Sequence, residues 1–376
     1  MNFDLSDDQK MLQDQARRYL SDHVRFDALR AAVDRGETID AALWKGIAEL
    51  GWPAVAIPEE FGGLGLGFLE QCVIVEELGR SVAPVPFVSS VGLGARIILR
   101  AGSAAQQARW LPALASGEAI AGFTFFEGAG PPDAQTMQSF ATTASAGALT
   151  GRKWPVLDAG AASLLVVVAR EEGGSLGLYV VETGASGLRM DPLSGFDQMR
   201  GGWSVDFDRS PGERLEGDAA AAIAEALDVA ATLTAFEQVG GAEAALEMAR
   251  NYSMERRAFG RQIGSFQAIK HRLADMLTNI ELARSNAYYA GWALANQAPD
   301  RALAAATARV SATEAYEFAA RENMQVHGGI SFTWEADCHF HYRRSRLLAV
   351  AFGSPRFWNG RIVDELLAVP AAAPVH

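Results

Sequence analysis

The hydrophobic period of the chain changes twice, and these two changes limit the possible folds more than any other feature of the sequence. Apolar residues recur at helical spacing from Ser6 to about Gly117, and again from about Gly217 to the end. Between these regions lie short runs rich in β-branched and aromatic residues, which are typical of strands. The sequence therefore predicts a mostly helical α+β fold with domains at residues 1–117, 118–212 and 213–376.

The first region predicts an all-helical domain. Ser6 precedes Asp7 and Asp8 as an N-cap followed by acidic residues in the first turn. Further helices are predicted over residues 41–50, 69–80, 88–100 and 104–115. A stretch rich in glycine and proline at residues 51–68 could suggest a phosphate loop, but no lysine follows its glycines, so an irregular connection is favoured.

The middle region predicts a small β domain, and the last region a helical bundle. The strand-like runs are AIAGFTFF, GALTGRKWPV, ASLLVVVAR, LGLYVVET and GGWSVDFDR, and the segment from Glu127 to Thr143 is predicted to be a long loop. Three long helical stripes and a terminal helix follow. Three such helices with a fourth at the end indicate a four-helix bundle.

Charge and cysteine content exclude several classes of protein. The formal net charge of −12 argues against a general nucleic-acid binder. Cys72 and Cys338 cannot form a disulfide framework, the amino terminus lacks the pattern of a signal peptide, and no apolar run of membrane-spanning length stands out. Cys338, His339 and His341 lack a second ligand cluster, so no metal is expected. We expect a cytoplasmic protein without nucleic-acid or membrane partners.

The stretch YSMERRAFGRQIGSFQAIKHRLAD, from Tyr252 to Asp275, joins two of the long helices. Arg256 precedes Phe259 and Gly260, where a missing Cβ lets backbone approach a ligand, and Gln267 offers an amide that can donate and accept. These residue types favour a phosphate-binding corner for a dinucleotide-like cofactor. A plain helical corner with solvated arginines is the alternative, and the stretch alone does not separate the two.

The domain order and two motifs resemble the FAD-dependent acyl-CoA dehydrogenase family across nearly the whole chain. The first motif is ERRAFGRQIGSFQAIKHRLADM, residues 255–276, and the second is QVHGG, residues 325–329. PEEFGG at 58–63 and APVPF at 83–87 resemble a bacterial branch that includes mixed complexes of two related chains, some acting on bulky acyl-CoA thioesters in lipid or steroid degradation. The resemblance implies an N-terminal helical domain, a middle β-barrel or sandwich, and a C-terminal four-helix bundle.

The resemblance also implies FAD bound across a subunit interface. Its pyrophosphate and adenosine half would contact one set of residues: Arg256, Phe259, Gly260, Gln267, Gln325, Gly328 and Gly329. These residues would serve the flavin of a neighbouring subunit, so a homodimer, a homotetramer or a heterotetramer with a paralogous chain is implied. For His327, capping of helix carbonyls is preferred to catalysis.

The implied reaction oxidises an acyl-CoA to a 2-enoyl-CoA, with a carboxylate taking the α-proton while flavin accepts the hydride. The usual base position falls on Phe352, which cannot accept a proton. The alternative position on the first bundle helix falls on Ala230. Asp228 and Glu237 are the nearest acids on that helix and are weak candidates for the base, with a surface carboxylate as the alternative role for each.

The positions implied to hold this chain's own flavin ring and substrate are mostly replaced. Thr124 and Trp154 keep a hydroxyl and an aromatic ring there, and Ala231 stands where an arginine is usual. This pattern favours one partner of a mixed dehydrogenase complex. A non-catalytic subunit that supports FAD is the main alternative, and another flavin reaction such as hydroxylation is a third. A basic cluster, Arg343, Arg344 and Arg346, suggests an interface, an anion site or a solvated helix face.

Overall fold

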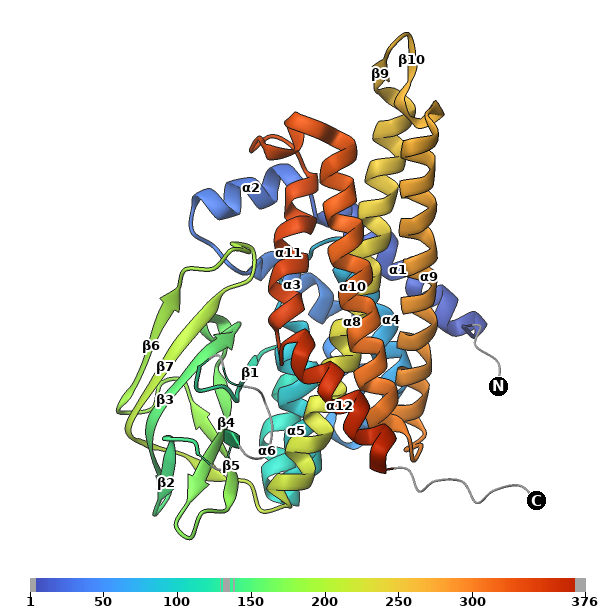
Figure 1. The fold of residues 1–376 in the computed structure, drawn as a ribbon. Helices are drawn as coiled ribbons and strands as arrows, with labels where there is room; N and C mark the ends of the chain where they lie inside the picture. The colour runs from blue at the N-terminus through green and yellow to red at the C-terminus, as the bar shows by residue number, and fades with distance from the viewer. Residues whose placement is uncertain (1–4, 129, 131–135, 138, 369–376) are drawn as a thin grey trace, which may run out of the picture.

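The computed structural model describes residues 5–128, 130, 136–137 and 139–368. Figure 1 shows the helices packed alongside one another, with the strands gathered on one side of them. Helices at both ends of the chain and strands in the middle confirm the predicted, mostly helical α+β fold. The domain boundaries proposed from the sequence stay predictions.

The first helical region begins at the predicted cap. The Ser6 hydroxyl accepts a hydrogen bond from the Gln9 backbone N–H, and the Gln9 side chain accepts one from Ser6 N–H, which together make a capping box. The sequence does not predict α2, because Leu29 is the one fully buried side chain in it. The helices are α1 (Asp7–His23), α2 (Phe26–Asp34), α3 (Ala41–Glu49), α4 (Phe68–Arg80), α5 (Arg96–Ala101) and α6 (Ala104–Ala115).

Residues 88–100 differ from the single helix that the sequence predicts. Val88–Ala95 is a π-helix, and α5 continues from it. Glycines allow very close packing in this segment, because a Cβ on Gly92 would lie 2.5 Å from the Leu233 side chain and one on Gly94 would lie 2.3 Å from that of Ala121. The wider turn therefore occurs where the first region meets both the sheet and the bundle.

The β domain is one sheet in the order β6-β7-β3-β2-β4-β5-β8, with β1 paired to β4. All five predicted runs contain strands. Three further strands, β2, β6 and β8, are missed because they are short and carry polar, charged or proline residues. The strands are β1 (Ala121–Thr124), β2 (Thr143–Ser145), β3 (Ala148–Leu157), β4 (Leu164–Glu171), β5 (Leu176–Glu182), β6 (Leu188–Leu193), β7 (Gly202–Pro211) and β8 (Glu213–Arg214).

The bundle confirms the three long helices and divides the terminal one into two. Its helices are α8 (Ala219–Glu255), α9 (Gln267–Ala295), α10 (Arg301–His327), α11 (Cys338–Val350) and α12 (Pro355–Ala368). Helix α8 lies against α4 at backbone distance: a Cβ on Gly240 would lie 1.9 Å from the Glu76 carbonyl oxygen, and one on Gly79 would lie 2.0 Å from that of Glu237. Glycine is therefore required on both sides of this crossing.

Helix α8 corrects one expectation from the sequence. By length and composition it could cross a membrane, since an 18-residue window within it has a mean hydropathy of 1.5. However, 78% of that window is buried inside the fold. Its apolar surface is covered by the protein's own helices, so α8 is the central core helix of the bundle.

The stretch between α8 and α9 forms a small hairpin, β9 (Arg257–Ala258) and β10 (Arg261–Gln262), which Figure 1 shows projecting beyond the ends of both helices. Phe259 and Gly260 make its two-residue turn with φ angles of 50° and 80°. Positive φ at both central residues is the requirement of a type I′ hairpin turn, which glycine meets easily and phenylalanine does not.

Candidate functional site

A cavity of about 180 Å³ lies between the sheet and the bundle. Its walls come from the segment around β1, from β3, from the loop between β6 and β7, and from the end of α11. Most of the lining side chains are apolar; they include Phe125, Phe126, Pro155, Leu157, Leu193 and Phe352.

This cavity collects positions that the family resemblance relates to the flavin ring and the base. Phe125 and Phe126 belong to the segment that would hold the ring, Pro155 follows Trp154 in β3, and Phe352 stands at the usual base position. Phe352 is 7% exposed and has a φ of 56°. Positions far apart in the sequence therefore meet at one place in the fold, and the side chains there are apolar.

Thr124 and Trp154, both predicted to contact a flavin, do not line this cavity. Thr124 is fully buried, and its hydroxyl donates to the Val166 carbonyl oxygen at 3.1 Å. Trp154 is 43% exposed and lies beside Gly128. Because successive side chains of a strand point to opposite faces, Pro155 and Leu157 form the wall where the sequence pointed to Trp154.

Five buried charged residues form one network beside the cavity. Arg200, which lines the cavity, donates to Asp158 at 3.0 Å and to Glu237 at 3.1 Å. Arg344 donates to Glu237 at 3.0 Å and to Asp197 at 2.5 Å. Each of these side chains is at most 6% exposed. Charges this deeply buried require partners, and the network supplies them within the chain.

The network joins all three parts of the fold. Ser89 of the π-helix donates to Asp158 at 2.5 Å, Arg200 precedes β7, and Glu237 and Arg344 belong to α8 and α11. No sequence pattern predicts this network. The sequence shows only isolated acids and arginines near apolar stretches, and no periodicity indicates that residues 37 to 147 positions apart will meet.

The two weak candidates for the base have different surroundings. Glu237 accepts hydrogen bonds from both Arg200 and Arg344, so its oxygens are already engaged. Asp228 pairs with Arg361 of α12 at 2.5 Å, and burial raises the pKa of its carboxyl to about 6. Neither residue lines the cavity. A catalytic role for either one stays a prediction.

The three arginines of the basic cluster of α11 each have a different partner. Arg344 belongs to the buried network, Arg346 pairs with Glu317, and Arg343 bonds Gln198. The predicted single interface or anion site is therefore not formed by these arginines together. Within the described ranges, no group of three histidine, cysteine, aspartate or glutamate side chains is arranged to hold a metal ion.

The predicted phosphate-binding corner is exposed. Arg256, Gln267 and Gln325 have exposed side chains, and none of these side chains has a hydrogen-bond or ion-pair partner in the part of the chain that the structure describes. Phe259 is 95% exposed on the hairpin turn, and Phe332, shortly after Gly329, is 83% exposed. This end of the bundle therefore presents two things to its surroundings: polar groups that can bind an anion, and exposed aromatic rings.

The stretch from Tyr252 to Asp275 contacts the second motif at its first residue. The Tyr252 ring stacks on His327 with 4.2 Å between ring centroids. His327 Nδ1 lies 2.9 Å from the Asn323 carbonyl oxygen, one turn earlier in α10, which agrees with the preferred capping role. Gly328 then ends α10 with a φ of 68°. The hairpin and the glycine pair therefore belong to one surface.

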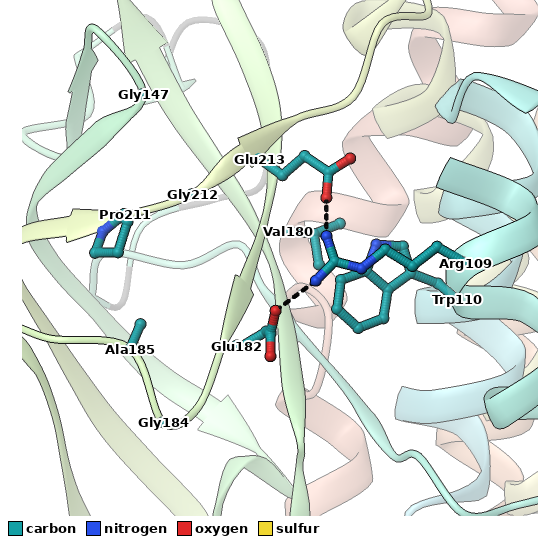
Figure 2. Close-up of a pocket in the computed structure, with 10 residues that line it drawn as sticks. All are labelled: Arg109, Trp110, Gly147, Val180, Glu182, Gly184, Ala185, Pro211, Gly212 and Glu213. Atoms are coloured by element: carbon teal, nitrogen blue, oxygen red, sulfur yellow. Dashed lines mark hydrogen bonds and ion pairs between the residues drawn. The ribbon is translucent and has the colours of Figure 1, made fainter. Parts of the chain in front are cut away.

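A larger cavity of about 620 Å³ lies elsewhere, between α6 and the sheet, and contains none of the predicted site residues. Figure 2 shows Arg109 reaching from α6 toward two glutamates. Its guanidinium pairs with Glu182 at 2.7 Å and Glu213 at 3.0 Å, and lies 4.2 Å from the Trp110 ring centroid. Because this arginine is already paired, the cavity offers no free cation to a cofactor phosphate among its lining residues.

Comparisons with known proteins agree with these features. Residues 6–118 match the family model described as acyl-CoA dehydrogenase, N-terminal domain, and residues 220–363 match the acyl-CoA dehydrogenase C-terminal domain. Acyl-CoA dehydrogenase IpdE2 of Mycobacterium tuberculosis is 31% identical over 97% of this chain and 99% of that protein.

Two solved structures are similar over nearly their full length. One is a variant of the Tcur3481-Tcur3483 steroid ACAD, 30% identical, with a TM-score of 0.86 over 96% of this chain and 98% of that one. The other is the ChsE4-ChsE5 complex of Mycobacterium tuberculosis, 25% identical, with a TM-score of 0.90 over 99% of this chain and 100% of that one.

Proposed function

Because the chain belongs to the acyl-CoA dehydrogenase family, whose cofactor is FAD, we propose that it is one subunit of a flavin-dependent acyl-CoA dehydrogenase that works beside a paralogous chain. In the proposed complex, this chain gives the partner's flavin its outer binding corner. The partner holds the flavin ring and supplies the carboxylate base. The similarity to a two-chain complex supports this assembly.

One observation carries the proposal: the chain's own central cavity lacks an available carboxylate, whereas its corner offers unpaired polar groups. Phe352 lies on the cavity wall at the usual base position. The one carboxylate on the described wall, Asp197, is paired with Arg344. A proton acceptor must reach the α-carbon with a free oxygen, so this cavity is a poor place for the reaction.

The corner fits the outer half of FAD. The Arg256 guanidinium is exposed, unpaired in the described chain and able to donate two parallel hydrogen bonds to a pyrophosphate. Gln267 can bond a phosphate or ribose oxygen, and Gly260 lets the backbone approach closely. A chain of net charge −12 needs such a local cationic group to attract a phosphate.

The cavity does not fit the flavin ring equally well. Its volume is about 180 Å³, and Phe125, Phe126 and Phe352 occupy its wall. The ring has a polar edge that needs donors, and most of the lining side chains offer none. When bound in the complex, FAD supplies the acceptor for the substrate hydride. This chain's residues bind its phosphates and shape the interface.

A non-catalytic role, in which the chain supports FAD for an active partner, is the second candidate, and Phe352 favours it. The same proposal includes an acyl-CoA as the substrate and a cytoplasmic location for the complex. Among the similar structures one is described as a steroid ACAD, so a bulky acyl-CoA is the first substrate class to test.

The test is to express the chain alone and with paralogues that carry an intact base, then measure FAD by its absorbance per chain. We expect a colourless isolated chain and a complex with one FAD per pair of chains that oxidises an acyl-CoA. A base-to-glutamine change in the partner should abolish turnover without loss of FAD. Full FAD and turnover in the isolated chain would overturn the proposal.

A further inference from the structure

The central cavity has walls suited to a different ligand from the flavin ring. Phe125 and Phe126 come from the segment after β1, Phe352 from the end of α11, and Leu157 and Leu193 from the sheet. Aromatic rings and branched aliphatic side chains on facing walls leave an apolar space of about 180 Å³. Spaces of this kind favour apolar ligands over water, because water needs two or more polar partners.

The charged groups at this cavity are paired within the protein. Arg200 donates to Asp158 and Glu237, and Asp197 accepts from Arg344. A ligand with its own charge would therefore meet no free counter-charge from these residues. Ser194, an exposed serine, is the other polar side chain on the described wall. A neutral ligand pays the smallest desolvation cost in such a place.

The same network fixes one wall of the cavity in place. Arg200 joins the loop between β6 and β7 to α8 at 3.1 Å, and Asp197 of the same loop joins Arg344 of α11 at 2.5 Å. Moving this loop away from the helices would separate these buried pairs, which is costly because each charge would lose its partner. The cavity is therefore held in shape by the chain itself, and a ligand need not organise it.

We propose that this cavity binds one compact, uncharged apolar ring. The inference rests on the proposed function, in which the flavin ring belongs to the partner chain. An apolar protein cavity of roughly 150 Å³ accepts benzene, so the space here suits a single ring with a small substituent. The ligand is a free ring compound or the ring end of an acyl thioester. In both cases the apolar walls of the cavity would contact the ring in the same way.

Fluorobenzene is the probe. Its binding to the isolated full chain and to the complex is measured by ¹⁹F NMR. We expect saturable binding with a Kd on the order of 0.1–1 mM, as the size of the probe allows. Phe352→Trp should fill the cavity and weaken binding at least tenfold, and Leu157→Phe gives a second filling variant should the first fail to fold. Leu366→Phe, on the exposed surface of α12, is the matched control and should leave binding unchanged.

Three results would overturn the inference: no saturable binding, equal binding by the filling variants, or stoichiometric FAD in the isolated chain. The last would also overturn the proposed function, whereas the first two leave it intact because they need neither FAD nor the partner. A fluorophenylacetyl-CoA thioester that binds no more tightly than fluorobenzene assigns the site to a free ring. If the thioester binds at least ten times more tightly than fluorobenzene, a free ring compound is overturned as the ligand and the cavity is assigned to the ring end of an acyl thioester.

Discussion

The corner at the end of α8 and the cavity beside α11 are opposite in character. Arg256, Gln267 and Gln325 are exposed at the corner and lack partners in the described chain. At the cavity, Arg200 and Asp197 are buried and fully engaged by the protein's own charges. Polar groups left exposed are available to another molecule, while polar groups paired inside the fold serve the fold.

This difference separates a binding role from a catalytic role within one chain. A family member that reacts alone needs both a phosphate corner and a cavity with a free base. In the proposed function this chain provides the first, and Phe352 lines the second at the position where the base is expected. Substitutions on each side of this contrast should therefore differ in whether they affect the stability of the chain or the binding of FAD.

Arg344→Met tests whether the buried side of the contrast serves the fold. The change leaves Asp197 and Glu237 without one of their partners, and breaking a buried ion pair costs about 3–5 kcal/mol of unfolding free energy. Urea unfolding of the isolated chain measures it. The neighbouring Arg343→Met, which removes a half-buried arginine that has no ion-pair partner in the described chain, should cost less than about 1 kcal/mol. Equal losses would contradict a special role for the network.

Asp228→Asn tests an acid of the central helix outside both regions. Burial raises its folded pKa to about 6, above the unfolded value of about 4. Its contribution to stability is therefore full below pH 4 and is lost as the pH rises through 6. Between pH 4 and 7 the parent chain should lose about 2 kcal/mol relative to the variant. If the unfolding free energies of the two proteins change equally with pH over this range, the raised pKa of Asp228 is refuted.

Arg256→Ala tests the exposed side. Loss of a charge-assisted contact to pyrophosphate should weaken FAD binding by the complex roughly 10- to 100-fold, with little change in the stability of the isolated chain. FAD retention during dialysis and the unfolding midpoint give the two readouts. Arg250→Ala, on the last turns of the same helix, should leave FAD in place. A fall in stability without loss of FAD would make the corner structural.

Phe259→Asn separates local strain from assembly. Phe259 has a φ of 50° in a tight turn that asparagine tolerates better, so the isolated chain should gain up to about 1 kcal/mol. Its ring is 95% exposed, and losing it should weaken a complex that covers it. Unfolding and analytical ultracentrifugation measure the two effects. An unchanged assembly would place the interface elsewhere.

The sequence was most informative where structure is local or a motif is continuous. The Ser6 cap, the long helices and the strand-rich runs were predicted because each depends on neighbours within a few residues. The corner could be proposed because residues 255–276 carry its motif in one continuous stretch. Short strands such as β2, and the π-helix at Val88–Ala95, were missed because contacts with distant segments stabilise them.

The amino-acid sequence alone was enough to predict the mostly helical α+β class and to propose the corner residues, and it places a phenylalanine, which is not a carboxylate, at position 352. The tertiary structure decided which strand face meets the cavity, which is why Pro155 and Leu157 form the wall and Trp154 does not. It also decided that Glu237 and Arg344 are partners 107 positions apart. Local patterns fix helices and turns, but the pairing of buried charges depends on how those elements pack.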